Sequence, residues 1–426
     1  MLSIKRRDES MMHIVSHSIH PQETSPRSQG EQQWLPLSHV LLENVLTQRE
    51  APLDAVALHC LPPLQEEEAL LLRFWHQGRP TLTNIVTTPL GRVGNILLPI
   101  AISHADDDEQ RQKLIQQACQ AVAIARSCGA RSVSLSTPLA SVTHEGQLIQ
   151  EYQVLRADDR PRLTTADATT SAAALLTLEW ILARVARDLR REQIVAVGSD
   201  PLASTFLRLL LVTLPHPASV ILCSQPGQQA QIERLVRELR ASGFEGEILL
   251  IDTLQEGESA PDAVYEATLL LGTGSFLERL NIDRIRAGTI VFRFSGLSPL
   301  VAEPLLARVR AHEDILVPLV DELTFPTAVQ AHRGFEKGSM LDLLLQAEER
   351  WGGRTPYQIK SSLLAGLAVA TLDVPPALGW VDTKTAQSHY LALRRAGARG
   401  IAPHLGVQDA PSACLMEFRA RFRNRV

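Results

Sequence analysis

The chain has 426 residues, of which 45% are hydrophobic, 21% charged and 4% aromatic, and its formal net charge is −5. This composition excludes a disordered protein, and the length favours two domains. The small negative charge argues against a nucleic acid or an anionic membrane as partner. The longest apolar runs, such as Ile96 to Ile102, are far shorter than a transmembrane helix, and no apolar signal-peptide stretch follows the first charged residues.

The spacing of the cysteines indicates the redox state of the cellular compartment. Five cysteines are dispersed along the chain without a CxxC pair, which excludes a disulfide framework or a zinc knuckle and predicts a reducing, cytoplasmic location. Residues 1–35 are rich in Ser, Gln, His and charge, so we expect a disordered tail. Its three histidines have no neighbours that would position them around a metal, and we predict no metal site.

An N-terminal α/β domain is predicted for residues 36–165. Its expected elements are strands at 55–60, 84–87 and 132–136, an apolar run at 96–102, and helices at 66–76 and 109–128.

A Rossmann-like domain is predicted for residues 166–325. After a long helix at 170–190, short apolar strands alternate with helices, which is typical of a doubly wound parallel sheet covered on both faces. The expected strands are 194–197, 220–223, 248–251, 268–271, 289–292 and 315–317, with helices at 202–214 and 228–242.

Residues 326–406 are predicted to form a helical segment that packs back on the N-terminal domain, with helices at 357–372 and 383–395. Residues 407–426 are predicted to be a basic tail, because four arginines occupy every second position from Arg419 to Arg425. This strip is interpreted as solvated, with binding of a partner as the alternative.

The turn after the first strand of the Rossmann-like domain is where a dinucleotide phosphate would bind. Here it reads Gly198, Ser199, Asp200 and Pro201, so only the glycine of the tight turn is kept and proline removes an amide donor. Asp200 and Pro201 are also a favourable start for a helix. Structural capping and retained cofactor binding both remain open.

Other candidate cofactor-binding residues follow later strands. Ser224 and Gln225 follow the second strand, where they could bond to a ribose or its phosphate, so NADP(H) and NAD(H) are not distinguished. Gly272, Thr273 and Gly274 follow the fourth strand and would let a flat ring approach the backbone, or would only form a turn. Arg293 ends the fifth strand, where it would meet an anion or form a surface salt bridge.

The order of these segments resembles the long-chain acyl-[acyl-carrier-protein] reductases, which form aldehydes, and their dehydrogenase-like relatives. The resemblance runs thinly over residues 53–406, and it is carried by segments 87–93, 129–139, 164–170, 194–204 and 379–397. It implies an NADPH-binding Rossmann domain, an acyl thioester or acyl carrier protein as partner, and a cysteine thiolate that takes the acyl group before hydride releases the aldehyde.

The chain departs from that family where chemistry is expected. The A-C-x-A-E pattern of the family matches residues 365–369, where Gly366 stands at the cysteine position and Val369 at the glutamate. Ala166 and Asp167 replace a glycine and an asparagine before the long helix. Cys414 is the only cysteine further along, and nothing near it would lower its pKa. We therefore expect the scaffold to be kept and the thiol chemistry to be lost.

Two functional hypotheses follow. The first is a divergent NAD(P)-dependent oxidoreductase that acts on a small or carrier-bound carbonyl without a covalent intermediate, with His59 and Asp167 as candidate proton donors. His59 as a core histidine and Asp167 as a helix cap are the structural alternatives, and Asp321 and Glu322 are expected to be solvated. The second hypothesis is a non-catalytic relative, a pseudoenzyme that binds a partner in a lipid or polyketide pathway.

Overall fold

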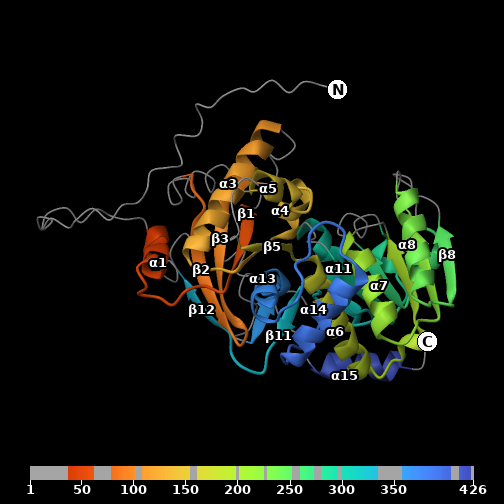
Figure 1. Cartoon of the computed structure of the whole chain (residues 1–426). Coiled ribbons are helices and arrows are strands. Elements are labelled where there is room, and N and C mark those ends of the chain that lie inside the picture. Colours follow the sequence, from red (N-terminus) through yellow and green to blue (C-terminus); the bar gives the residue numbers. More distant parts are fainter. Residues whose placement is uncertain are drawn as a thin grey trace, which may run out of the picture. The chain divides into compact units, whose positions relative to one another are not determined.

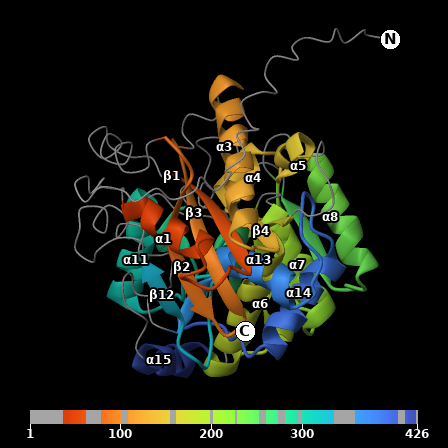
Figure 2. The same ribbon diagram turned by 60° about the vertical axis from the view of Figure 1, so that its left-hand side comes forward.

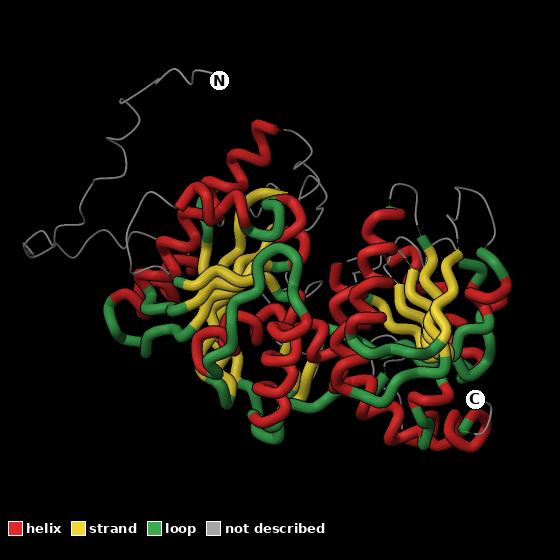
Figure 3. The backbone as a smooth tube through the Cα atoms, turned by 45° about the vertical axis from the view of Figure 1, so that its right-hand side comes forward, coloured by secondary structure: helices red, strands yellow, loops and turns green. Residues whose placement is uncertain are grey.

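The computed structural model describes residues 37–61, 78–101, 108–153, 161–197, 201–224, 228–251, 260–272, 280–294, 299–333, 357–403 and 412–423. Its strands form two larger sheets, each flanked by helices, and one small pair (Figures 1 and 3). Within these ranges no helix is long and apolar enough to cross a membrane.

The first sheet has six strands in the order β12-β2-β3-β1-β4-β5. The strands β3, β1, β4 and β5 run parallel, while β2 pairs antiparallel with both β3 and β12. Their bounds are β1 Ala55–Leu61, β2 Thr81–Thr88, β3 Gly91–Ala101, β4 Ser132–Leu135, β5 Arg162–Thr165 and β12 Gln330–Arg333.

Helices cover the two faces of this sheet differently. Helix α3 (Asp108–Ser127) buries Leu114, Ala118 and Val122 at helical spacing in one core with Val56 and Leu58 of β1 (Figure 2). Helix α1 (Leu37–Leu46) joins the same core, and the short helices α4 (Thr137–Val142) and α5 (Gln147–Gln153) follow β4. Successive side chains of a strand point to opposite faces, so Ala55, Ala57 and His59 face the other side. There Ala55 packs against helix α13 (Ser361–Thr371).

The second sheet is entirely parallel, in the order β10-β9-β6-β7-β8. In chain order this is fifth, fourth, first, second, third, which is the strand order of the Rossmann fold. The bounds are β6 Gln193–Val197, β7 Ser219–Cys223, β8 Glu247–Ile251, β9 Leu269–Gly272 and β10 Ile290–Arg293.

Both faces of this second sheet are covered except at the edge strand β8, which is partly exposed. Ile194 and Ala196 of β6 belong to a core with helices α6 (Asp167–Val185) and α7 (Pro201–Thr213), whereas Val195 and Val197 belong to a core on the opposite face. The remaining helices around this sheet are α8 Gln229–Ala241, α9 Asp262–Tyr265 and α11 Pro299–His312. The chain therefore has an α/β fold with a doubly wound, Rossmann-like sheet, and this prediction is confirmed.

The last helices pack on α6 and its neighbours. Helix α14 (Thr383–Arg395) contacts α6 and α7, and the buried His389 of α14 bonds to Thr169 at 2.9 Å. Trp380, which precedes α14, lies between the guanidinium groups of Arg208 on α7 and Arg234 on α8, at 4.6 and 4.4 Å from its ring. The segment before α14 is thus held to the second sheet's helices.

Several expected elements differ from those observed. The helix expected at 357–372 begins only at Ser361, because Gln358–Lys360 form strand β13, which pairs antiparallel with β11 (Glu322–Thr324). In place of the strand expected at 315–317, Leu316 makes a single bridge to Ile290, and a second bridge joins Leu319 to Arg293. The helix expected at 66–76 lies outside the described residues.

Part of the expected basic tail forms a helix. Residues Ser412–Phe422 form helix α15, which packs against α6 and buries Leu415, Phe418 and Phe422 at positions i, i+3 and i+7. The described arginines of the strip, Arg419, Arg421 and Arg423, are exposed, as the solvated interpretation expects.

Candidate functional site

A group of polar side chains lies on the neighbouring strands β1, β3 and β2 of the first sheet. His59 comes from the end of β1, and its Nε2 is shielded from solvent. Asn95 of β3 is completely buried, and its amide nitrogen donates to the side-chain oxygen of Asn84 on β2. Polar side chains in a buried sheet face are unusual, so this group, with Lys360, is the strongest candidate site in the described structure.

Lys360 reaches this group from another part of the chain. It is the last residue of β13 and stands directly before the first residue of α13. Burial is the main cause that lowers the pKa of His59 to about 3, the ammonium group of Lys360 lowers it further, and the Asn95 side chain opposes the shift. At neutral pH the imidazole of His59 is therefore uncharged, and the charge of Lys360 acts on it from the junction of β13 and α13.

An acidic residue lies opposite Lys360 in the small sheet of β11 and β13. Glu322 of β11 stands opposite Lys360 in the antiparallel pair and is 2% exposed, so the expectation that Glu322 is solvated is wrong. The backbone N–H of Ser361 donates to the carbonyl of Asp321 at 2.7 Å, and the Ser361 hydroxyl bonds to Thr170 of α6 at 2.7 Å. These bonds fix the junction between β13 and α13, and with it the backbone of Lys360.

Asp167, the second predicted proton donor, occupies a separate position. It is the first residue of α6, follows the end of β5, and is 5% exposed. The helix begins at Asp167 itself and its cap position is Ala166, so Asp167 is not the N-cap residue. Strand β4 lies between β1 and β5, so the sheet places Asp167 two strands away from His59.

Of the predicted cofactor-binding residues, Ser224 and Gly272 lie in the described structure. Gly198, Ser199, Gln225, Thr273 and Gly274 lie outside the described residues. Ser224 is buried after β7, and its backbone N–H donates to the carbonyl of Ile251 at 3.1 Å. Gly272 ends β9 and pairs with Arg293, the half-buried last residue of β10.

This edge of the second sheet fits a dinucleotide in part. The first strand, β6, leads into α7, as in dinucleotide-binding folds, and Gly272 has no side chain to keep a flat group from the backbone. Against the fit, α7 begins with Pro201, which has no amide hydrogen to donate to a phosphate. The residues that would hold a bound dinucleotide in the described structure are Gly272 and Arg293.

Gly366 lies at a close contact between α13 and the first sheet. A Cβ atom at this position would lie 3.1 Å from the Cβ of Ala55 and 3.4 Å from the hydroxyl of Ser134. The Ser132 hydroxyl donates to the Gly366 carbonyl at 2.5 Å, and Ser134 donates to the carbonyl of Ser362 at 2.8 Å. A cysteine here would be wedged between helix and sheet, where no acyl group could reach it.

The thiols of the chain are poorly suited to nucleophilic attack. Burial raises the pKa of Cys60 and of Cys223 to about 12, and that of Cys119 and of Cys128 to about 11. Cys414 lies on α15, where partial burial and its bond to Glu313 also raise its pKa. Since a thiolate is the reactive form, this chemistry agrees with the expected loss of a nucleophilic cysteine.

Sequence reasoning missed Lys360, Asn95 and Asn84. Lys360 was not selected because residues 357–372 were expected to form one helix. A strand ending at this lysine, directly before a buried helix, would have made it a candidate site residue. Asn95 did leave a trace in the sequence, as a lone amide just before the apolar run that begins at Ile96. Among the described residues, no group of three or more His, Cys, Asp or Glu side chains could hold a metal ion.

No protein-family model and no curated protein matches this chain. Among solved structures, the chain is similar to L-tryptophan dehydrogenase from Nostoc punctiforme, at 11% identity and a TM-score of 0.38, over 87% of this chain and 89% of that one. It is also similar to shikimate 5-dehydrogenase from Listeria monocytogenes, in complex with shikimate and NAD, at 14% identity and a TM-score of 0.33, over 63% and 87%.

A third similar structure is the Δ1-pyrroline-2-carboxylate reductase of Thermococcus litoralis in complex with NADH and L-proline, at 12% identity and a TM-score of 0.24. That match covers 32% of this chain and 40% of the reductase. At these TM-scores the likeness carries no argument, and the Rossmann-like fold rests on the strand order of the second sheet.

Proposed function

We propose that the protein is an NAD(P)-dependent oxidoreductase that reduces a small or carrier-bound carbonyl compound without a covalent enzyme intermediate. The observation that carries this proposal is the buried polar group of His59, Asn95 and Asn84 on the first sheet, on which the charge of Lys360 acts. The Rossmann-like strand order supports it, because this fold commonly binds a dinucleotide along the carboxyl edge of its sheet.

The roles of the side chains follow from their protonation states. The nicotinamide, when bound, supplies the hydride to the carbonyl carbon. Lys360 donates a proton to the carbonyl oxygen as negative charge develops there, and the product is an alcohol. His59, which burial holds neutral, takes up no proton in this step, and solvent returns a proton to Lys360 after the product leaves. Asn95 positions the imidazole through its contact with it.

From the resemblance to acyl-carrier-protein reductases we take only the proposed substrate class, acyl thioesters. An acyl thioester is a carbonyl compound, and direct hydride addition followed by loss of the thiol would release an aldehyde without an acylated cysteine. The packing at Gly366 and the raised pKa values of the thiols support a route of this kind over the covalent one. An acyl carrier protein or free acyl thioester is therefore the proposed partner.

The first test is binding of NADPH and NADH to the purified protein by calorimetry, followed by oxidation of the bound cofactor with aldehydes and acyl thioesters. Lys360→Met is expected to lower kcat by about 10²- to 10⁴-fold, the usual contribution of a general acid, and to leave the Kd of the cofactor unchanged. Lys113→Met is the matched control, because Lys113 makes only an exposed ion pair with Glu109 on α3. Equal kcat values in the two variants would remove Lys360 from the mechanism.

Pro201 favours a second candidate function. A helix that begins with proline lacks one amide donor at the position where a dinucleotide phosphate would bind. A protein that binds no dinucleotide does not need this donor. Such a protein would act as a binding or regulatory partner in a lipid or polyketide pathway. Absence of NADPH and NADH binding at millimolar concentration would exclude hydride transfer and leave this second function.

A further inference from the structure

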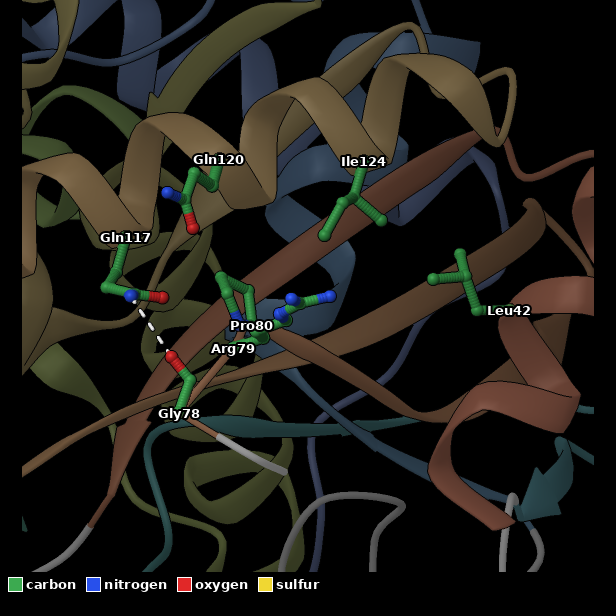
Figure 4. Close-up of a pocket in the computed structure, with 7 residues that line it drawn as sticks. All are labelled: Leu42, Gly78, Arg79, Pro80, Gln117, Gln120 and Ile124. Atoms are coloured by element: carbon green, nitrogen blue, oxygen red, sulfur yellow. Dashed lines mark hydrogen bonds between the residues drawn. The ribbon is translucent and has the colours of Figure 1, made fainter. Parts of the chain in front are cut away.

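A pocket of about 440 Å³ lies on the α3 side of the first sheet (Figure 4). It is lined by Leu42 of α1, residues 78–80 just before β2, and Gln117, Gln120 and Ile124 of α3. The three α3 residues are spaced at i, i+3 and i+7, so they lie along one face of the helix. This volume is within the range of about 300 to 1,000 Å³ that is typical of small-molecule sites.

The charge of the pocket is positive. Arg79 has an exposed guanidinium group, and no ion pair is found for it in the described part of the chain. No aspartate or glutamate is among the lining residues. A guanidinium group pairs best with a planar anion such as a carboxylate, through two parallel hydrogen bonds. Since the lining has one cation, it matches one carboxylate better than a chain of phosphates.

Two side-chain amides, of Gln117 and Gln120, also line the pocket. The Nε2 of Gln117 donates to the carbonyl of Gly78 at 3.2 Å, and this bond fixes which end of the amide is the oxygen. Its Oε1 is shielded and has no hydrogen-bond partner within the described residues. In Figure 4 Gln117 and Gln120 extend from α3 toward residues 78–80, and the Arg79 side chain extends to the side of Leu42. A ligand N–H or O–H would supply the missing partner once the half-exposed Gln117 side chain turns toward it.

The remaining lining is aliphatic. Leu42, Pro80 and Ile124 provide an apolar wall, and no aromatic ring is present among the lining residues on which a base could stack. The absence of an acidic side chain from this lining also favours a neutral donor over an ammonium group. We infer that the pocket binds a monocarboxylate with a neutral hydrogen-bond donor next to its carboxyl group and an aliphatic side chain, such as a 2-hydroxy acid or an N-acylamino acid.

This site is separate from the proposed reaction site. Helix α3 packs with Val56 and Leu58 on one face of β1, whereas Ala55, Ala57 and His59 face the other side of the strand. A ligand in the pocket therefore cannot meet His59, and it binds as an effector and not as the reacting substrate.

The test is calorimetry on the full chain with two probes, (S)-2-hydroxy-4-methylpentanoate and N-acetyl-L-leucine. We expect both to bind with a Kd of roughly 1 mM or lower. Arg79→Gln is expected to weaken binding by about tenfold or more, and Gln117→Leu by about fivefold. The matched controls Arg237→Gln, on the exposed side of α8, and Gln116→Leu, on the exposed side of α3, should leave the Kd unchanged.

Three comparison ligands sharpen the assignment. N-acetyl-L-leucinamide lacks the carboxylate, 4-methylpentanoate lacks the donor, and L-leucine carries an ammonium group, so each should bind more weakly than the two probes. Absence of binding by both probes at about 10 mM would overturn the proposal. Unchanged affinity in Arg79→Gln, or equal affinity for the amide or for 4-methylpentanoate, would overturn it as well.

Discussion

The two larger sheets meet their covering helices through different chemistry. In the second sheet, Ile194, Leu271 and Phe292 pack against aliphatic and aromatic side chains, among them Phe206 of α7, whose ring lies 5.6 Å from that of Phe292. In the first sheet, α13 rests on Ala55 and on two serines whose hydroxyl groups donate to its backbone carbonyls. Large side chains fill the space in one interface, whereas small ones bring helix and sheet together in the other.

This difference predicts opposite responses to mutation. An interface filled by large side chains is weakened when atoms are removed, because a cavity remains. An interface made of small side chains is weakened when atoms are added, because the helix cannot move away without breaking its bonds to the sheet. Four predictions test the comparison.

The largest effect is expected from Phe292→Ala in the second sheet. Phe292 is fully buried, and loss of its ring should lower the free energy of unfolding by about 3–5 kcal/mol. Leu250→Ala is the control on the edge strand β8, where the side chain is 50% exposed and the change should stay within about 0.5 kcal/mol. Denaturant unfolding measures both values, and a similar loss in the two variants would contradict the cavity argument.

Gly366→Cys should lower the free energy of unfolding by about 2–3 kcal/mol, because the added side chain meets Ala55 and Ser134. It should also form no acyl adduct when incubated with an acyl thioester, as judged by mass spectrometry. Thr371→Cys, at the half-buried end of the same helix, is the control and should be tolerated better. An adduct on the thiol introduced by Gly366→Cys would show that the helix leaves this position accessible.

A pH effect is expected in the first sheet. The folded-state pKa of His59 is about 3 and its ordinary value is 6.5, so the unfolded chain takes up a proton before the folded one does. Its contribution to stability is therefore complete above pH 6.5 and falls as the pH drops toward 3, by about 2 kcal/mol at pH 5. His59→Gln should flatten the unfolding free energy between pH 7 and pH 5 relative to the unmodified chain. An unchanged slope would mean that His59 titrates normally.

The smallest effect is expected from Ser132→Ala, which removes one hydroxyl donor between the sheet and α13. The loss should be about 1 kcal/mol, the net value of a typical hydrogen bond. Ser127→Ala is the control, because that exposed hydroxyl bonds only to a carbonyl of its own helix. Equal unfolding free energies in these two variants would show that the bond to Gly366 contributes nothing measurable.

The second sheet was predictable because its strands are short apolar runs separated by helices of regular period, and local pattern decides such elements. The strands at 194–197, 220–223 and 248–251 match β6, β7 and β8 within one residue at each end. The helix at 109–128 matches α3 for the same reason.

The candidate site was harder to predict, because its residues come together only through long-range packing. His59 was identified from its place at a strand end, but Lys360 lies about three hundred positions later along the chain and reaches it only because β13 interrupts an expected helix. Residues Gln358–Lys360 pair with β11 although the sequence around them has a helical pattern. No local feature of the sequence predicts this pairing.

The position of Trp380 between two guanidinium groups also gives the molecule an optical probe. Indole emission depends on nearby charge and on solvent, and both change if the segment before α14 leaves Arg208 and Arg234. The fluorescence difference between the unmodified chain and Trp380→Phe therefore isolates the signal of this one indole among the five tryptophans. Movement of the segment against α7 and α8 can then be followed in solution without an attached dye.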